Sequence, residues 1–273
     1  MAVFKANKSF DEFNLDWNWF DHNHVMHRAY KTPSTIPGFT RYPSHAVIKG
    51  VKAGEPDQSF YAFGTNLGFS RGGVLNRGIV KALLRHDSTN DIDLFSIKGI
   101  RIKASALGKV MDTQSAKDDR LLLAKLLGGN DVVTLSGEAD RFSGYGGRDT
   151  ISGNAGDDVL KGGRGNDEID DGTGNDKVFG NVGKDWLFLN AGDDLLNGGR
   201  GTDTLFITGA TGATVDLSNT GVQDTGYGND TVKGIENIVG SLQDDTLTGN
   251  AAANEIDGNA GDDTIYGGAG DDK

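Results

Sequence analysis

The chain has 273 residues, 36% of them hydrophobic, which is enough for two modest domains with packed cores. It contains no cysteine, so disulfide bonds and thiol chemistry are excluded. No stretch approaches the roughly 18 apolar residues of a transmembrane helix, and the first residues lead into polar sequence. We therefore expect neither a membrane-spanning helix nor a Sec-type signal peptide.

The net charge of −12 is divided unevenly along the chain. Residues 1–135 carry 18 Lys and Arg against 13 Asp and Glu, a net charge of +5, whereas residues 136–273 carry 9 against 26, a net charge of −17. Glycine is distributed in the same way as the acidic residues, with 30 of the 42 glycines in the second part. The acidic part is expected to bind cations, and the basic part favours acidic partners such as a polysaccharide or a cell surface, with no role for nucleic acid.

Residues 1–130 are predicted to form a small, strand-rich α+β module. The opening of the module is rich in aromatic residues, which favour a small core or a docking face, with a sugar-stacking surface as the alternative. These residues are Phe4, Phe10, Phe13, Trp17, Trp19 and Phe20. The basic, aromatic-rich composition identifies no fold for this module.

Two short motifs in the module could carry chemistry. His22, His24 and His27 lie close enough in sequence to bind a transition metal, although no helical or strand period aligns all three. Residues 68–72 spell Gly-x-Ser-x-Gly around Ser70, like the nucleophile elbow of lipases. The sequence before Ser70 lacks the pattern of a buried strand, so neither motif is assigned a catalytic role.

A hairpin is the preferred interpretation of the region around Ser70. Gly72-Gly73 is predicted to turn the chain between strands at 61–69 and 74–85. Further on, apolar residues from Ile92 to Ile102 predict strand segments separated by turns. Helices are predicted at 104–107 and 118–127, and the second of these is expected to cap the region that follows.

A repeat of nine residues dominates the chain from Gly144 to Phe206. Each unit reads Gly-(Gly/Asn)-x-Gly-x-Asp-x-apolar-x, and the phase holds over seven units. The sixth place is occupied by Asp149, Asp158, Asp167, Asp176, Asp185, Asp194 and Asp203. The eighth place is occupied by Ile151, Leu160, Ile169, Val178, Leu187, Leu196 and Leu205. Such a fixed period is typical of a stacked repeat in which the aliphatic residues point inward.

The residue types of each unit predict a turn followed by a short strand. Glycines tolerate positive φ, so six residues can form a tight turn that exposes backbone carbonyls. Carbonyl and carboxylate oxygens together suit a hard cation, and Ca²⁺ accepts a flexible oxygen-only shell better than Mg²⁺ does. We therefore expect oxygen ligands from the sixth-place aspartates and from the fourth-place glycines Gly147, Gly156, Gly165, Gly174, Gly183, Gly192 and Gly201.

These units resemble the calcium-binding nonapeptide repeats of the RTX family of bacterial secreted proteins. The resemblance implies a mainly β fold, a right-handed parallel β-roll in which two units form one coil. It also implies that Ca²⁺ lies between a turn and the turn two units later on the same flank. The implied pairs are 149/167, 167/185, 185/203, 158/176 and 176/194. Asp171 and Leu189 depart from the pattern, because they replace first-place glycines.

The repeat continues less regularly on both sides of this region. Asp131 and Asp140 keep the phase but lack most glycines, so they are expected to be structural. Residues 131–206 form the first array, 207–239 a non-repeat spacer with a strand at 213–217 and a repeat-like turn at 228–232, and 240–273 a second array in a new phase. The second array contributes Asp245 and Asp263 as expected metal ligands, and the uncharged Asn254 between them predicts a weaker site.

Three classes of function remain open, and the last of them is a purely structural spacer. The first is a secreted calcium-binding protein without catalysis of its own, which folds when it meets extracellular Ca²⁺ and whose N-terminal module binds a surface or polysaccharide. The second is a fragment of an RTX exoenzyme, either a lipase or a polysaccharide-modifying enzyme. The resemblance further implies export by the type I secretion apparatus if a C-terminal signal exists.

Overall fold

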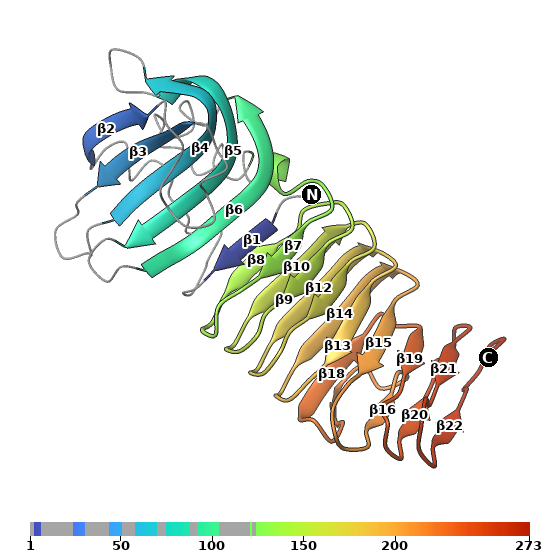
Figure 1. The fold of residues 1–273 in the computed structure, drawn as a ribbon. Helices are drawn as coiled ribbons and strands as arrows, with labels where there is room; N and C mark the ends of the chain where they lie inside the picture. The colour runs from blue at the N-terminus through green and yellow to red at the C-terminus, as the bar shows by residue number, and fades with distance from the viewer. Residues whose placement is uncertain are drawn as a thin grey trace. The chain divides into compact units, whose positions relative to one another are not determined.

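The computed structural model describes the backbone of six N-terminal strands, together with residue 121 and residues 124–273 (Figure 1). The chain divides into two compact units, and the boundary lies between Gly128 and Gly129. The six strands are β1 (Val3–Ala6), β2 (His24–Tyr30), β3 (Ser44–Gly50), β4 (Gln58–Phe69), β5 (Leu75–Asp87) and β6 (Ile92–Lys103).

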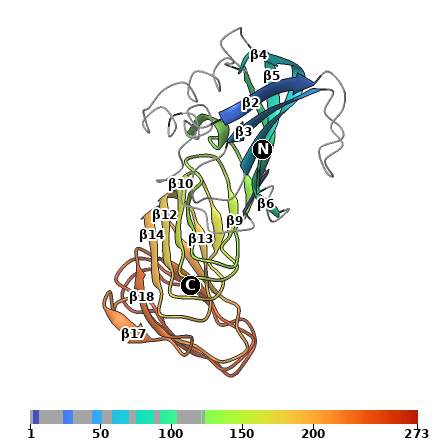
Figure 2. The same cartoon turned by 90° about the vertical axis from the view of Figure 1, so that its left-hand side faces the viewer.

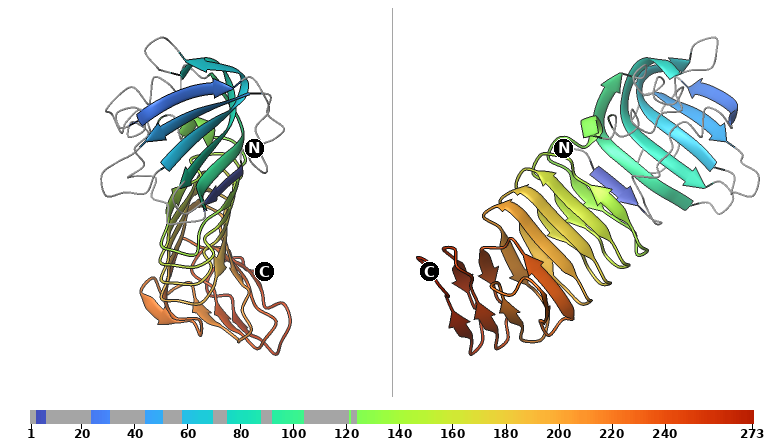
Figure 3. Two further views of the ribbon diagram at one scale, coloured as in Figure 1. Left: turned by 60° about the vertical axis from the view of Figure 1, so that its left-hand side comes forward. Right: turned by 180° about the vertical axis from the view of Figure 1, so that it is seen from behind.

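The first unit contains an antiparallel sheet with the strand order β2-β3-β4-β5-β6-β1. Successive strands from β2 to β6 are neighbours in the sheet. The register of β5 shifts near Val80 and near Arg85, and Figure 3 shows β2 to β6 as a strongly twisted sheet.

The structure confirms the predicted hairpin, because β4 and β5 pair antiparallel. The prediction of separate strand segments between Ile92 and Ile102 was wrong, because β6 is one strand of 12 residues. The helix predicted at 118–127 is present at Leu121 and at 124–126, whereas the helix predicted at 104–107 lies outside the described residues.

The candidate chemical motifs of the first unit fall on strand backbone or outside the described residues. His24 and His27 lie in β2, while His22 and Ser70 are outside the described part of the chain. Of the opening aromatic residues, Phe4 lies in β1 and the others are not described. A nucleophile elbow requires a strand followed by a helix, whereas β4 is followed by β5.

The second unit is a parallel β-roll in which successive strands alternate between two sheets (Figures 1 and 2). The first sheet has the order β7 (Val132–Thr134), β9 (Thr150–Ser152), β11 (Glu168–Asp170), β13 (Trp186–Leu189), β15 (Thr204–Ile207), β19 (Asn237–Val239) and β21 (Glu255–Asp257). The opposite sheet contains β8 (Arg141–Ser143), β10 (Val159–Arg164), β12 (Lys177–Gly183), β14 (Leu195–Gly201) and β18 (Asn229–Lys233). The parallel pairing within both sheets confirms the predicted β-roll.

The core of the roll is formed by the eighth-place residues. Ile169 pairs with Ile151 on one side and with Leu187 on the other, so equivalent aliphatic side chains stack along the roll. All seven predicted eighth-place residues are fully buried. Phe142, in the irregular unit before them, is buried in the same way. The period of nine therefore sets both the register and the burial of the strands.

Residues 207–239 contain four strands, one of which confirms the strand predicted at 213–217. β16 (Thr214–Asp216) begins a third sheet, which continues with β20 (Thr246–Thr248) and β22 (Thr264–Tyr266). β17 (Val222–Asp224) pairs antiparallel with β18, which itself extends the second sheet after β14. Figure 3 shows the red strands of the last coils continuing the stack of yellow and orange strands.

No helix in the described part of the chain is long and apolar enough to cross a membrane.

Candidate metal centre

The sixth-place aspartates form two ladders, one along each flank of the roll. In each step, the backbone N–H of one aspartate donates to Oδ1 of the aspartate 18 residues later. On one flank the donor–acceptor distances are 2.8–2.9 Å, from Asp131 through Asp149, Asp167 and Asp185 to Asp203. On the other they are 2.7–2.8 Å, from Asp140 through Asp158 and Asp176 to Asp194. The pairs expected from the repeat are therefore neighbours in the structure.

In the seven sixth-place aspartates from Asp149 to Asp203, the second carboxylate oxygen is buried and has no hydrogen-bond partner. This holds for Oδ2 of Asp149, Asp158, Asp167, Asp176, Asp185, Asp194 and Asp203, and also for Oδ2 of Asp171. A buried polar atom without a partner costs roughly 1–3 kcal/mol. A row of such atoms, all of them in equivalent turns, points to a ligand that is bound between the turns.

In the units that begin with glycine, the first-place glycine leaves room beside the unpartnered oxygen. A Cβ atom on Gly144 would overlap Oδ2 of Asp149 and would lie 2.6 Å from the carbonyl oxygen of Gly162, the first-place glycine two units later. The same arrangement recurs at Gly180, where the added atom would meet the carboxylate of Asp185. Each turn thus brings a carboxylate oxygen and a backbone carbonyl oxygen to one small space.

The fourth-place glycines hold the turns in a conformation that other residues rarely adopt. All seven expected residues, from Gly147 to Gly201, have φ between +109° and +156°. They also stack closely, because a Cβ atom on Gly165 would overlap the carbonyl oxygen of Gly147. The N–H of Gly165 donates to the carbonyl of Val182 at 2.9 Å, which joins this turn to the next one on the flank.

Burial raises the pKa values of the ladder carboxyls. Removal from water is the largest cause; the backbone N–H donor opposes it, and neighbouring carboxylates raise the values further at most positions. The pKa is raised to about 7 for Asp149, Asp158 and Asp194, and to about 6 for Asp167, Asp176, Asp185 and Asp203. The ladders are therefore unfavourable places for negative charge unless a cation lies among them.

In turns that lack a fourth-place glycine, the second-place residue donates hydrogen bonds to the sixth-place side chain. We call these turns closed. In the turn with Glu138 at that place, Ser136 donates to Oδ2 of Asp140 from both its N–H and its hydroxyl, each at 2.8 Å. In the turn with Gln243, the N–H of Ser241 donates to Oδ2 of Asp245 at 2.7 Å.

Asp245 and Asn254 of the second array are therefore placed differently from the aspartates of the first array, whereas Asp263 is placed like them. Ser241 also donates its hydroxyl to Oδ1 of Asp245 at 3.0 Å, so both oxygens of that carboxylate have partners. Asn254 accepts the N–H of Asn250 at 2.8 Å in a similar closed turn. Asp263 lies in a turn whose fourth-place Gly261 has φ of +135°, like the turns of the first array. Its Oδ1 accepts the N–H of Asp245.

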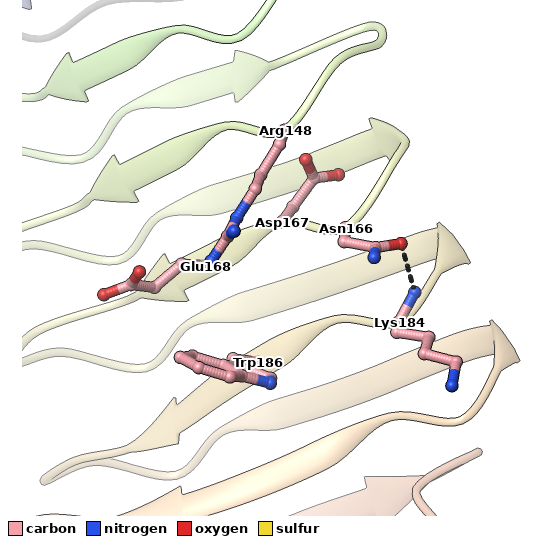
Figure 4. Close-up of a pocket in the computed structure, with 6 residues that line it drawn as sticks. All are labelled: Arg148, Asn166, Asp167, Glu168, Lys184 and Trp186. Carbon is pink, nitrogen blue, oxygen red and sulfur yellow. Dashed lines mark hydrogen bonds between the residues drawn. The ribbon is translucent and has the colours of Figure 1, made fainter.

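A further series of hydrogen bonds, which the sequence analysis missed, links the fifth places on both flanks. The side-chain oxygen of Asn166 accepts the N–H of Lys184 at 3.0 Å (Figure 4), and Asp157 accepts the N–H of Asn175 at 2.9 Å. Asn175 in turn accepts the N–H of Asp193 at 2.8 Å. The signal in the sequence was the recurrence of Asn or Asp at the fifth place.

The outer surfaces of the two flanks differ in charge. On one flank, a hollow of about 240 Å³ is lined by Arg148, Asn166, Asp167, Glu168, Lys184 and Trp186 (Figure 4). The ring of Trp186 lies 5.2 Å from that of Phe206. On the other flank, the lining of a groove of about 410 Å³ includes five aspartates, among them Asp157 and Asp193, and one basic residue, Lys177. The basic residues of the first hollow lie at fifth places, where Arg148 and Lys184 replace Asn or Asp.

The residues present fit a calcium ion. We call a turn open when it has a fourth-place glycine and Oδ2 of its sixth-place aspartate has no partner. The ligands that each open turn offers are carboxylate and backbone carbonyl oxygens, which are hard ligands. The spaces between these glycine-rich turns recur along each flank. Soft or nitrogen ligands for a transition metal are not part of these turns. Asp149, Asp158, Asp167, Asp176, Asp185, Asp194 and Asp203 are the side chains that would hold the ions.

Comparison with known proteins agrees with the geometry of the turns. Residues 134–169, 170–205 and 239–273 match the family model described as RTX calcium-binding nonapeptide repeat (4 copies). No curated protein matches the chain. Residues 134–205 and 239–273 therefore belong to the RTX calcium-binding nonapeptide repeats, and their metal is Ca²⁺.

Proposed function

We propose that this protein is secreted and that its β-roll folds when extracellular Ca²⁺ fills the open turns. The observation that carries the proposal is the row of buried Oδ2 atoms that have no partner within the protein. When bound, Ca²⁺ supplies positive charge and a coordination shell for these oxygens. The protein's own residues supply the ligands, the glycine turns that bring them together and the N–H groups that orient each carboxylate.

The open turns define five spaces between successive aspartates on the same flank. They are the spaces 149/167, 167/185, 185/203, 158/176 and 176/194, and in each of them both Oδ2 atoms are unpartnered. At the C-terminal ends of the two ladders, the polar groups already have hydrogen-bond partners within the protein. The N–H of Asp203 donates to Glu236, and Oδ2 of Asp230 accepts the hydroxyl of Thr225. Asp245 and Asn254 are likewise saturated, so we assign five calcium ions to the first array and none to the Asp245 turn.

Calcium-dependent folding follows from the electrostatics of the ladders. Without the ion, folding must bury a row of carboxylates that repel one another. With the ion, neighbouring carboxylates are attracted to a shared cation instead of repelling one another, and the binding free energy contributes to folding. Extracellular calcium modules commonly bind with dissociation constants of roughly 10⁻⁴–10⁻³ M, so such a protein stays unfolded in the low calcium of a cytosol.

The test is a calcium titration of the purified full chain, followed by circular dichroism and by calorimetry. The proposal predicts a cooperative gain of β-structure that saturates with about five bound ions and reverses when a chelator is added. Magnesium at the same concentration is expected to have little effect, because it prefers a rigid octahedral shell. A chain that binds no calcium, or that is equally folded in chelator, would disprove the proposal.

We further propose that the N-terminal module binds a surface or an acidic polysaccharide. The net charge of +5 over residues 1–135 supports this, because positive charge attracts acidic ligands over long distances. The full chain in saturating calcium should bind acidic glycans in preference to neutral ones. The binding should weaken as the salt concentration rises. Equal binding to neutral and acidic glycans, or none to either, would argue against this role.

The competing function is that of an RTX exoenzyme or a fragment of one. Assays with ester and uronan substrates would detect it, with Ser70→Ala and His24→Ala as controls. The antiparallel pairing of β4 and β5 on either side of Ser70 favours a hairpin over a nucleophile elbow, so we expect no serine-dependent esterase activity. Turnover that is lost in Ser70→Ala would reverse this assignment.

A further inference from the structure

One open turn carries an additional acidic residue. Asp171 occupies the first place of its unit, where three neighbouring open turns have Gly153, Gly162 and Gly180 and the next turn on the same flank has Leu189. Its side chain is fully buried, and its Oδ2 atom has no hydrogen-bond partner. A buried carboxylate without a partner is costly, so its presence at a place that holds glycine in most units and never another charged residue in the first array requires an explanation.

The carboxylate of Asp171 lies with two carboxylates of the ladder. One oxygen of Asp171, one of Asp176 and one of Asp194 lie within 4.8 Å of one another, and all three residues are buried. Two ligands of a single calcium ion can be as far apart as about 4.8 Å, since each lies roughly 2.3–2.6 Å from the ion. The three oxygens are therefore close enough to bind the same cation.

Neighbouring residues hold Asp171 in this position while leaving one oxygen available. The side-chain amide of Asn190 donates to Oδ1 of Asp171 at 2.9 Å, and it also donates to Oδ1 of Asp170 at 2.9 Å. The hydroxyl of Thr208 donates to the side-chain oxygen of Asn190 at 3.3 Å, which fixes the orientation of the amide. The other two carboxylates are also anchored through Oδ1, by the N–H groups of Asp158 and of Asp176.

We propose that Asp171, Asp176 and Asp194 form a calcium site with three carboxylates, which binds Ca²⁺ more tightly than the two-carboxylate sites of the roll. This inference rests on the proposed calcium function. The other four spaces of the first array pair two sixth-place aspartates across a first-place glycine. Calcium affinity rises with the charge and number of the ligands, so one extra carboxylate at a prearranged position strengthens the site. The first ion to bind therefore enters near the middle of one flank.

Removal of the charge of Asp171 is the direct test. The full chain is titrated with Ca²⁺ in competition with a chromophoric chelator of known affinity, which resolves the tightest step. Asp171→Asn retains the size of the side chain and an oxygen that can accept from Asn190. It should weaken the tightest step about tenfold or more while the total number of bound ions stays the same. Asp171→Gly restores the usual first-place residue and should have a similar effect.

The matched control removes one nearby charge without removing a proposed ligand. Asp157 lies at a fifth place on the same flank, and its Oδ1 accepts the N–H of Asn175. The amide oxygen that Asp157→Asn introduces could still accept this N–H. The variant should change the tightest step by about twofold or less, because an exposed charge acts through water. Circular dichroism in saturating calcium checks that every variant forms the roll.

The outcomes separate this inference from the proposed function. If the unmodified chain binds no calcium, both fail. If it binds calcium but Asp171→Asn and Asp171→Gly retain its tightest step within about twofold, only the three-carboxylate site fails. An equal loss in Asp157→Asn would also overturn the inference, since it would show an effect of general charge rather than of a ligand.

Discussion

At the residue scale, the Oδ2 atom of the sixth-place aspartate accounts for the residue types of the repeat. Oδ1 of each sixth-place aspartate accepts a backbone N–H, while Oδ2 faces the space between two turns without a partner. The first-place glycine keeps that space open, and the fourth-place glycine provides the positive φ of the turn. The aspartate and the glycines therefore act together, and neither residue type would make the site alone.

The fourth-place glycine should be intolerant of a side chain. Gly165 has φ of +124°, and an added Cβ atom would overlap the carbonyl oxygen of Gly147. We expect Gly165→Ala to lower the free energy of unfolding in saturating calcium by roughly 1–3 kcal/mol, measured by denaturant unfolding. Gly137→Ala is the control, because a Cβ atom on Gly137 would meet nothing within 4 Å. Equal effects of the two substitutions would contradict the role assigned to the turn.

An aspartate that is shared by two spaces should matter more than one at the end of a ladder. Asp167 borders the spaces 149/167 and 167/185, whereas Asp203 borders only 185/203. We expect Asp167→Asn to impair two calcium sites and Asp203→Asn to impair one. Equilibrium dialysis at a free calcium concentration that just saturates the unmodified chain would count the ions. The same loss for both variants would show that ions do not lie between successive aspartates.

Sequence reasoning found most of these residues but did not distinguish open from closed turns. It placed the sixth-place aspartates and the fourth-place glycines of the first array from their period alone. It treated Asp245 as equivalent to them, although Gln243 replaces the fourth-place glycine and Ser241 fills the turn with hydrogen bonds. A hydroxyl at the second place and a missing glycine at the fourth are together the signal that was overlooked.

At the scale of the elements, each coil is held to the next by aliphatic packing and by main-chain hydrogen bonds. Strands of three to seven residues would be unstable alone, and the stacking of successive coils gives them a continuous core. Leu187, for example, lies between Ile169 and Leu205 in the first sheet and is fully buried. The metal sites and this core are therefore formed by the same coils.

Truncation of a core side chain should destabilise even the calcium-loaded protein. Leu187→Ala removes a fully buried side chain between two neighbours, and such substitutions commonly cost about 2–5 kcal/mol. Denaturant unfolding in saturating calcium measures the loss. Leu242→Ala is the control, because Leu242 is 66% exposed and should change stability by less than about 0.5 kcal/mol. A similar small change for both would mean that the eighth place contributes little.

The elements were predictable where the sequence is periodic and less so elsewhere. The strands from β9 to β15 follow the eighth-place period, and their parallel pairing follows from two units per coil. Residues 207–239 lack the period, so only a strand and a turn could be predicted there. The structure shows that β18 and β19 continue the two sheets while β16 begins a third. Long-range pairing of this kind has no local signature in the chain.

At the scale of the whole molecule, acidic residues and glycines are concentrated in the half of the chain that forms the roll. A net charge of −17 over residues 136–273 opposes compaction, and burial of the ladders adds to that cost. The proposed calcium ions would reverse both effects at once. The absence of cysteine is consistent with a fold that a bound metal, rather than a disulfide bond, holds together.

The stability of the ion-free roll should fall as the pH rises. The pKa of ladder carboxyls such as Asp149 and Asp194 is raised from 3.8 to about 7, so between these values the folded chain holds more protons than the unfolded chain. The free energy of unfolding therefore decreases across this pH range and levels off above it. Circular dichroism in chelator should show more β-structure at about pH 5 than at about pH 7.5. More β-structure at the higher pH would contradict the burial of these carboxyls.

The most direct test of the account is hydrogen exchange, followed by mass spectrometry, on the full chain with calcium and with chelator. Peptides from residues 144–206 report on the coils that contain the proposed calcium sites. The account predicts strong protection of these amides in millimolar calcium and exchange close to that of an unfolded chain in chelator at neutral pH. Equal protection under both conditions would show that the roll folds without the ion and would contradict the central claim.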